Sequence, residues 1–551
     1  MHYKRVRVYR CIFGLILLFL LLGYAVYFGN RQVQAISFSA ESGFYDEEFY
    51  LEINATQGAI YYTLDSSDPT ENSLVYTEPI LIKDASDNKN KYSVLTDVCL
   101  EFNEELKTLG TVKDLTDSGY SIPEHPVDKA TVVKAICIDQ DGNCSDIITG
   151  VYFVGFSNKS GYDNIHIVSV VTDPDNLFGY ENGIYVAGKQ FEDYYARVDS
   201  LEWCTIAPAN YWTRGVASER AASITIWNTE KKKVSYGTFD IKIQGKGSRF
   251  CIPKNLKICE TDTPDSNLNG AKLGFSSDID NVILFAGSQD QPSKLKNYLV
   301  SNMCEELNIT VRDFIPCELF LDGEYWGTYY LYESLEPKFF ENHYDVFAEN
   351  VEYVKNGLDS SMYNTMVNFI STNDMAIPEN YLRAQEVIDM DSCIDYFAVE
   401  IYIANHDWLP NNYGLWRTKS LANEMYSDTK WRWVLFDADN AMANANRASD
   451  DVSWAINHDS AFASLMENEE FESALYDRLI YLAENVFYPS DVDAFIDNYE
   501  TEMAGPMQND YQRFYENRRT MDDFYNGCED VKKFFHQRYD YIMETYGGEN
   551  E

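Results

Sequence analysis

Basic residues are scarce in this sequence. Its 551 residues include 88 Asp and Glu against 44 Lys and Arg, which gives a formal net charge of −44. A partner with a nucleic-acid backbone requires a basic binding face, so this balance argues against nucleic acid as a partner. An acidic surface keeps a protein soluble and attracts basic proteins, but many acidic surfaces serve solubility alone. A basic partner protein is therefore one of two interpretations of the charge.

Cysteine motifs and repeats are also absent. The 11 cysteines are scattered and none stands in a Cys-x-x-Cys pair, which argues against a zinc site. A chain of this length needs no disulfide to complete its core. Cys137 and Cys144 flank a predicted turn at residues 141–143 and are the one pair that we would join, but buried free thiols explain them equally well. The sequence contains no internal repeat and no low-complexity segment.

Apolar residues, by contrast, are plentiful. Hydrophobic residues make up 45% of the chain and aromatic residues 15%, which indicates packed cores rather than disorder. A chain of this length normally folds into two or three domains.

One long uncharged run begins at Cys11 and ends at Phe28, directly after a basic flank that starts at Lys4. Its length is close to that needed to span a bilayer, and a basic flank stays on the cytoplasmic side. We therefore expect residues 1–35 to form a cytoplasmic flank and a single membrane anchor, with the bulk of the chain outside the cell. The alternative is a signal peptide that is cleaved after residues 33–35, which would give a secreted protein.

Residues 36–155 show the pattern of a small β-sandwich. Short runs of alternating apolar residues are separated by Gly, Asp, Ser and Pro turns. A polar insertion at residues 84–127 interrupts this pattern, and we expect a long loop or a short helical excursion there. Residues 59–70 resemble the signature of the small domain that is appended to chitobiases and other secreted carbohydrate-active proteins. The resemblance implies an accessory module with a glycan as its candidate ligand.

A glycine-rich segment follows in a larger domain that we expect at residues 160–450. A predicted strand at residues 237–244 runs into Gly245 and Gly247, and glycines between two strands let backbone N–H groups approach a phosphate. Three basic residues could neutralise phosphate charge beside them: Lys246, Arg249 and Lys254. A plain hairpin is the alternative interpretation.

An Asp-Gly pair at residues 322–323 lies between two apolar runs, residues 316–321 and 327–332, and predicts a β-hairpin. Glu333 closes the second arm. In kinase-like sites an acidic residue positions the phosphate-binding lysine, and Glu333 is our candidate for that role toward Lys254. A surface Glu that ends a strand is the alternative.

The most informative stretch is residues 405–439. Two aromatic-rich runs, residues 413–417 and 430–436, predict the arms of a β-hairpin. This hairpin returns two carboxylates to the loop that precedes it, so that four oxygen-bearing side chains form one cluster: Asp407, Asn412, Asp437 and Asp439. Hard oxygen ligands of this kind suit Mg²⁺, which proteins hold together with substrate phosphates.

The spacing in this cluster matches the kinase catalytic loop, where an Asp is followed by an Asn five residues later and then by a strand pair that ends in a metal-binding Asp. On this interpretation Asp407 orients the acceptor hydroxyl and takes its proton. Asn412 and either Asp437 or Asp439 hold the metal on the phosphates. A solvated hairpin with Asp and Asn in its turns is the alternative.

Several stretches together resemble the CotH family of spore coat proteins, which are atypical, kinase-like phosphotransferases. The matching segments are residues 244–258, 285–299, 322–333, 405–417 and 431–439. The resemblance implies an α+β fold class, in which the small β-sandwich is followed by an atypical protein-kinase-like core at residues 160–450 and a helical C-terminal part at residues 451–551. Aromatic stripes in that last part are explained by packing between helices.

The resemblance also implies an ATP- and Mg²⁺-dependent protein kinase. Lys254 resembles the lysine that binds the ATP phosphates, and Asp407 resembles the catalytic-loop aspartate. The residues that resemble metal ligands are Asn412, Asp437 and Asp439. We therefore expect phosphoryl transfer from ATP to Ser or Thr of a partner protein, for which a basic protein is one candidate. The alternative is a non-catalytic scaffold or adhesion protein of the cell envelope that binds glycans.

Overall fold

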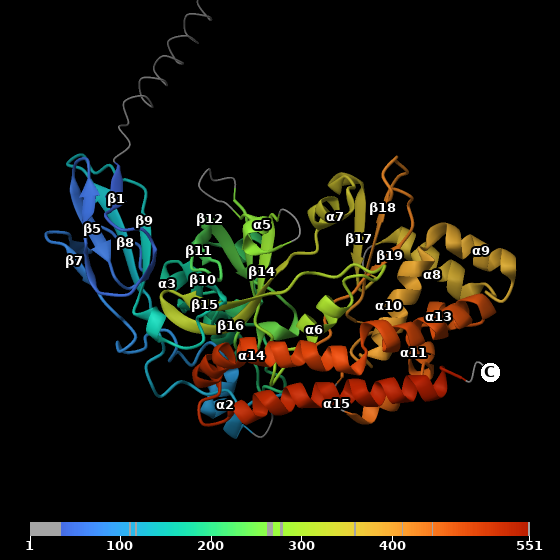
Figure 1. Cartoon of the computed structure of the whole chain (residues 1–551). Coiled ribbons are helices and arrows are strands. Elements are labelled where there is room, and N and C mark those ends of the chain that lie inside the picture. The colour runs from blue at the N-terminus through green and yellow to red at the C-terminus, as the bar shows by residue number, and fades with distance from the viewer. Residues whose placement is uncertain are drawn as a thin grey trace, which may run out of the picture. The chain divides into compact units, whose positions relative to one another are not determined.

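The computed structural model describes residues 35–548, except residues 110–111, 116–117, 262–267, 276–278, 358–359, 410 and 443–444. The chain forms two compact units, whose elements are labelled in Figure 1. The smaller unit consists of the chain up to Ser42, Glu48–Ile82 and Val132–Gly150, and the larger unit consists of Gly43–Glu47, Lys83–Thr131 and the chain from Val151 onward.

Short antiparallel strand pairs make up the smaller unit. β1 (Ile36–Phe38) pairs with β4 (Ile53–Ala55), β3 (Phe49–Leu51) with β7 (Ile80–Ile82), and β5 (Ala59–Thr63) with β6 (Leu74–Val75) and β8 (Thr131–Ile138). In β7, Ile80 and Ile82 are buried while Leu81 between them is exposed. This alternation is typical of a sheet with one face on the core. The prediction of a β-rich N-terminal region is confirmed.

The polar insertion predicted at residues 84–127 belongs to the larger unit. It contains a 3-10 helix, η1 (Leu100–Phe102), and a short helix, α2 (Glu104–Thr108), as the expected helical excursion requires. The buried carboxylate of Glu324 accepts hydrogen bonds from the backbone N–H groups of residues 91–93 at 2.5, 3.1 and 2.8 Å. One side chain thus holds the start of the insertion.

A closed barrel of seven strands is the centre of the larger unit. In spatial order the strands are β10 (His166–Val171), β11 (Arg220–Trp227), β12 (Lys233–Ile243), β13 (Leu256–Cys259), β14 (Asn281–Phe285), β16 (Glu324–Glu333) and β15 (Ile315–Leu321). β10 and β15 pair in parallel and close the barrel, and all other neighbours are antiparallel. The β15–β16 hairpin confirms the predicted Asp-Gly turn, since Asp322 and Gly323 both have positive φ.

A second, three-stranded antiparallel sheet carries the predicted catalytic segment. Its strands are β17 (Val351–Lys355), β18 (Gly414–Thr418) and β19 (Arg432–Val434), with α10 (Met390–Tyr402) packed against β19. The predicted hairpin is therefore confirmed. Its second arm, β19, is shorter than the predicted run at residues 430–436, and after β19 Leu435 N donates to the carbonyl of Thr310 at 2.8 Å.

The C-terminal part is helical, as predicted. Its helices are α11 (Ser453–His458), α12 (Ser460–Leu465), α13 (Glu469–Tyr481), α14 (Pro489–Phe514) and α15 (Met521–Thr545). α14 packs against the barrel strand β16 and against α15, and the two long helices run side by side in Figure 1. Every residue of β16 is buried, because one face of the strand lines the barrel and the other is covered.

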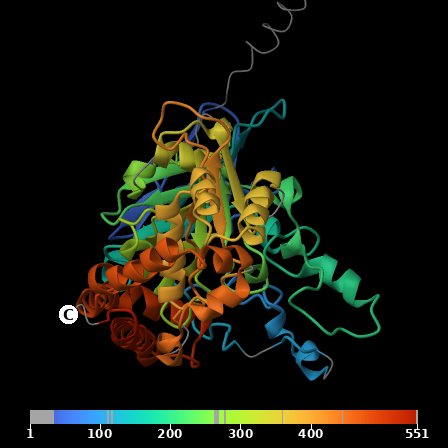
Figure 2. The same cartoon turned by 90° about the vertical axis from the view of Figure 1, so that its right-hand side faces the viewer.

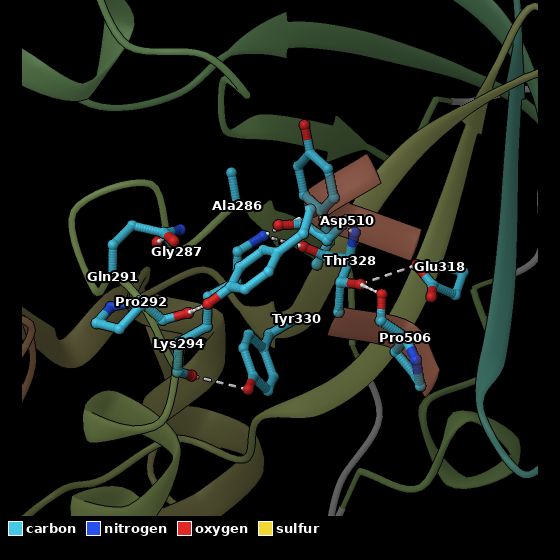
Figure 3. A network of polar contacts seen from close by, with 12 residues as sticks. Ala286, Gly287, Gln291, Pro292, Lys294, Glu318, Thr328, Tyr330, Pro506 and Asp510 are labelled. Carbon is cyan, nitrogen blue, oxygen red and sulfur yellow. Dashed lines mark hydrogen bonds and ion pairs between the residues drawn. The ribbon is translucent and has the colours of Figure 1, made fainter. Parts of the chain in front are cut away.

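A buried ion pair joins α14 to the barrel (Figure 3). Lys294 Nζ donates to Asp510 Oδ1 at 2.9 Å and to the carbonyl of Thr328 at 2.8 Å, and both charged side chains are fully buried. Thr328 N also donates to Asp510 Oδ1, at 3.0 Å, and its hydroxyl oxygen lies 3.1 Å from two acceptors for its one hydrogen, Glu318 Oε2 and the carbonyl of Pro506. Each charge is compensated by hydrogen bonds, which a buried pair requires.

The predicted membrane anchor needs a correction. Within the residues that the structure describes, no helix is long and apolar enough to cross a bilayer. The longest ones, α14 and α15, carry acidic and basic residues along their length, which a bilayer interior would not accept. The uncharged run at residues 11–28 lies outside the described residues.

The ion pair yields a test of the packing. We expect Asp510→Ala to destabilise the larger unit by about 3–5 kcal/mol, because the Lys294 charge stays buried without its partner. Asp497→Ala, on the same helix, removes an exposed partner of Lys532 and should cost at most about 1 kcal/mol. Thermal unfolding followed by circular dichroism measures both, and equal losses would contradict this account.

Candidate active site

The predicted catalytic loop leaves the end of α10 through several residues in the left-handed conformation. Ala404, Leu409 and Asn412 have φ values of 49°, 53° and 60°, and Asp437 across the loop has 69°. Non-glycine residues in this region cost of order 1 kcal/mol each and persist where the surrounding structure enforces them, often at functional sites. Backbone strain is thus concentrated where the sequence predicts the chemistry.

A buried amide connects α10 to the end of the hairpin. Asn405 is fully buried, and its Nδ2 donates to Glu400 Oε2 at 2.9 Å and to the carbonyl of Asp437 at 3.5 Å. Burial raises the pKa of Glu400 to about 8, against the opposing effect of hydrogen bonds from Asn405 and Tyr396. Glu400 is therefore mostly protonated at neutral pH and serves as a neutral hydrogen-bonding group.

Aromatic side chains on either side of Asp407 anchor the loop. His406 stacks on Trp454, with ring centroids 4.4 Å apart, and its Nε2 lies 2.7 Å from Asp450 Oδ2. Trp408 is buried among the aromatic rings of α10 and α11. Asp407 itself is exposed. The backbone is held from both sides while this carboxylate remains open to solvent.

Two amides link Asp407 to the residues with which it was predicted to cluster. Asn412 Nδ2 donates to Asp407 Oδ2 at 2.9 Å. Asn440 Nδ2 donates to the same oxygen at 3.3 Å and to Asp439 Oδ1 at 3.5 Å. The structure therefore brings the loop and the end of the hairpin together.

Asp437 and Asp439 form the more enclosed part of this cluster. Burial raises the pKa of Asp437, although the charges of Lys355 and Arg312 act in the opposite direction. The pKa of Asp439 lies well above its ordinary value because of burial and then because of the negative charges of Asp437 and Asp290. Carboxyl groups that repel one another in this way form a site that a cation would stabilise.

The start of α6 (Lys296–Met303) supports the acidic cluster. Asn297 Oδ1 accepts a hydrogen bond from Ala438 N at 2.8 Å, and Lys296 Nζ donates to the carbonyl of Asp439 at 2.9 Å. Asp290 Oδ1 is buried and has no hydrogen-bond partner among the described residues, and burial raises the pKa of Asp290 to about 6. The start of α6 thus adds a cation to the site, and the loop before it adds a further carboxyl group.

The glycine-rich loop lies between β12 and β13. Gly245 has a φ of 113°, which a residue with a side chain rarely adopts. Arg249 is buried, and its guanidinium donates to four backbone carbonyls, those of Tyr211, Thr213, Ile243 and Gly245. Lys246 is exposed. Arg249 therefore stabilises the loop itself, and Lys246 is the open charge on it.

Lys254 is fully buried behind the same loop. Its Nζ donates to the carbonyls of Arg249 and Cys251 at 2.7 and 3.0 Å and lies 4.3 Å from the ring centroid of Tyr211. Burial lowers the pKa of Lys254 to about 8. The structure does not bring Lys254 and Glu333 together in an ion pair, since Glu333 Oε2 lies 2.7 Å from His343 Nε2.

Cys251 lies between the glycine-rich loop and Lys254 in sequence. Burial raises the pKa of its thiol, the charge of Lys254 lowers it and the charge of Asp439 raises it. Charges from both segments thus act on this thiol.

The comparisons with known proteins agree with this geometry. A family model described as CotH kinase protein matches residues 241–542, more than half of the chain. This chain belongs to the CotH kinase protein family. A second model, described as Fn3 associated, matches residues 51–152 in the β-rich N-terminal region. No curated protein matches the chain.

The donor groups of this CotH domain fit a hard divalent cation in their chemistry. Carboxylate and amide oxygens are the ligands that Mg²⁺ takes from proteins, and the mutual repulsion of the acidic groups favours a cation among them. Among the described residues, however, no three His, Cys, Asp or Glu side chains converge closely enough to hold a metal ion. The described residues thus supply the ligand types of a Mg²⁺ site without bringing three such side chains to one point.

Sequence reasoning missed three cations at the CotH site. Lys296 contacts the backbone at Asp439, and the charges of Arg312 and Lys355 act on Asp437. Lys296 stands inside a segment that carried the family resemblance, but no motif singled it out. Arg312 and Lys355 come from segments far from the hairpin in sequence, so only the folded chain reveals them.

The buried carboxyl of Glu400 predicts a pH-dependent stability. Its folded-state pKa of about 8 lies above the ordinary value of 4.5, so its protonation stabilises the fold fully below pH 4.5, and this contribution is lost as the pH rises to 8. Glu400→Gln keeps the hydrogen bonds without the charge. We expect the melting temperature of the variant to fall by several degrees less than that of the wild type between pH 6 and pH 9.

Glu470→Gln, an exposed change on α13, is the matched control and should follow the wild type. Parallel pH profiles for Glu400→Gln and the wild type would show that Glu400 does not titrate in this range.

Proposed function

We propose that this protein is an ATP-dependent protein kinase of the CotH type that transfers the γ-phosphate to Ser or Thr of a basic partner protein. The observation that carries the proposal is the meeting of the Asp407–Asn412 loop with Asp437 and Asp439 in one acidic cluster. Family membership supports phosphotransferase chemistry. The net charge of −44 favours a basic partner.

Each residue of the cluster has a distinct task in this mechanism. Asp407 is exposed and fixed by two amides, so it can orient the acceptor hydroxyl and accept its proton. Asn412, Asp437 and Asp439 would hold Mg²⁺. When bound, the cation neutralises charge on the phosphates.

The positive side chains around the cluster would also neutralise phosphate charge. Lys296 donates to the carbonyl of Asp439, and Lys355 Nζ and Arg312 Cζ lie 4.5 and 6.0 Å from the ring centroid of Phe436, which precedes Asp437. These three cations could contact phosphate oxygens of ATP. Lys254 acts differently, because its ammonium holds the carbonyls of the glycine-rich loop and so fixes the loop against the site. Catalysis by such a site consists mainly of positioning and electrostatic stabilisation.

A non-catalytic scaffold that binds glycans is the second candidate. The orientation of two side chains favours it. Arg249 and Lys254 donate to backbone carbonyls rather than to an open phosphate site. The Fn3-associated region supplies a separate module for ligand binding. This candidate predicts neither ATP binding nor phosphate transfer.

Removal of the central carboxylates tests the kinase proposal. We expect Asp407→Asn and Asp439→Asn each to lower phosphate transfer from ATP to a Lys/Arg-rich Ser peptide by at least about 100-fold, because a proton acceptor or a metal ligand is lost. Radiolabelled ATP measures the transfer. Asp345→Asn, at an exposed left-handed position that Asn tolerates, is the control and should keep full activity.

Nucleotide binding separates the two candidates without any substrate. ATP and Mg²⁺ together at about 100 times the dissociation constant should stabilise a kinase by about 2.7 kcal/mol, which raises the melting temperature. Lys296→Met should weaken this shift, whereas Lys272→Met, an exposed change on α5 (Gly270–Leu273), should not. The absence of any shift in the wild type would favour the scaffold.

A further inference from the structure

Asn440 lies between two carboxylates that have different tasks in the proposed mechanism. It directly follows Asp439 in the chain, and its side chain is exposed. Its Nδ2 donates to Asp407 Oδ2 at 3.3 Å and to Asp439 Oδ1 at 3.5 Å. One amide group thus contacts both the expected proton acceptor and a carboxylate that is expected to hold the cation.

A neutral donor suits this position. Burial has the largest effect on the pKa of Asp439, and the negative charge of Asp407 raises that pKa further, so the two carboxylates repel each other. The amide group of Asn carries two N–H donors, one for each carboxylate, and adds no charge. A lysine or arginine here would pair with the carboxylates and compete with a cation, whereas an acidic residue would add to the repulsion. An Asn side chain therefore joins the two groups and leaves their negative charge for a cation.

The two oxygens of the Asp407 carboxylate have different surroundings. Oδ2 accepts hydrogen bonds from Asn412 Nδ2 at 2.9 Å and from Asn440 Nδ2 at 3.3 Å. Among the residues that the structure describes, none donates to Oδ1, and the side chain is exposed. The carboxylate is thus held through one oxygen, while the other is open to an incoming hydroxyl group.

The two contacts of Asn440 are longer than an ordinary N–H···O hydrogen bond, which measures about 2.9 Å. Hydrogen bonds of catalytic groups are often long in a free enzyme and shorten when the substrate is bound. Asn412 can bind a cation through its Oδ1 and still donate to Asp407, because its Nδ2 is a separate atom. Both amides therefore remain available to Asp407 in a loaded site.

We propose that Asn440 is a positioning residue for phosphoryl transfer, whose amide holds Asp407 through Oδ2 so that Oδ1 faces the acceptor hydroxyl. The proposal rests on the proposed kinase function and adds a residue to its machinery. In the transfer step the acceptor oxygen bonds to the γ-phosphorus of ATP, its proton passes to Asp407 Oδ1, and the bond to the β–γ bridging oxygen breaks to release ADP. The proton can then pass to water because Asp407 is exposed.

Removal of the amide tests this assignment. Leu has nearly the shape of Asn without its hydrogen-bonding groups, so Asn440→Leu should lower kcat for transfer to a Lys/Arg-rich Ser peptide by about tenfold or more. The KM for ATP and the dissociation constant of Mn²⁺, measured by electron paramagnetic resonance, should change by less than about twofold, because the lost contact acts on the transfer step. Asn440→Gln restores an amide at an exposed position that has room for the longer side chain, and should recover most of the rate.

Asn485→Leu is the matched control. It removes another exposed amide, whose Nδ2 donates to the carbonyl of Tyr481 at 3.1 Å, and should keep the full kcat. A rise in the KM for ATP as large as the fall in kcat would assign Asn440 to nucleotide binding and overturn the proposal. A low rate in Asn440→Gln equal to that of Asn440→Leu would do the same.

The transfer assay also separates this proposal from the kinase function on which it rests. If the wild-type protein transfers no phosphate, the kinase function fails and the assignment of Asn440 fails with it. If the wild type and Asn440→Leu transfer phosphate with equal kcat, the kinase function stands and only the role of Asn440 is overturned.

Discussion

The site depends on one buried amide. Asn405 lies where α10 leads into the Asp407–Asn412 loop, and its amide donates to Glu400 Oε2 at 2.9 Å and to the carbonyl of Asp437 at 3.5 Å. A single side chain thus joins this loop to the acidic end of the hairpin. A buried amide that lost its hydrogen-bond partners would destabilise the fold, so shifts of the chain that break these bonds are unfavourable. Arg538 of α15 adds to it, because its guanidinium donates to the carbonyl of Ile401 at 2.8 Å. The strained loop residues keep their positive φ because such contacts hold the surrounding structure in place.

Local patterns predicted much of this structure. The Asp-Gly pair at residues 322–323 predicted its hairpin, and the aromatic runs around residues 413–436 predicted the strands that return Asp437 to the loop. Barrel closure escaped prediction because β10 and β15 pair in parallel across almost 150 residues of intervening chain, and no local signal reports such a contact. The contacts of Lys254 escaped for a related reason. Its spacing from the glycines suggested a phosphate, and only packing shows that carbonyls and aromatic rings surround it.

The distribution of charge bears on the proposal that this strongly acidic chain uses ATP. The net charge of −44 is a property of the whole surface, whereas the cations near Asp437 and Asp439 come from distant segments and meet only at the cluster. Their effect is local, since exposed charges are screened within about 10 Å at ordinary ionic strength. Under the proposed function, the phosphates of ATP would meet these cations, and a basic polypeptide would meet the acidic surface.

The contact of Glu324 with residues 91–93 has a practical consequence for anyone who dissects this protein. Residues 91–93 belong to the segment Lys83–Thr131 of the larger unit, and the chain re-enters the smaller unit directly after this segment. The larger unit is therefore not continuous in sequence. A truncation that starts near residue 160 would delete that stretch and leave a buried carboxylate facing empty space. Such a fragment should express poorly, whereas one that starts before residue 83 would retain the missing piece.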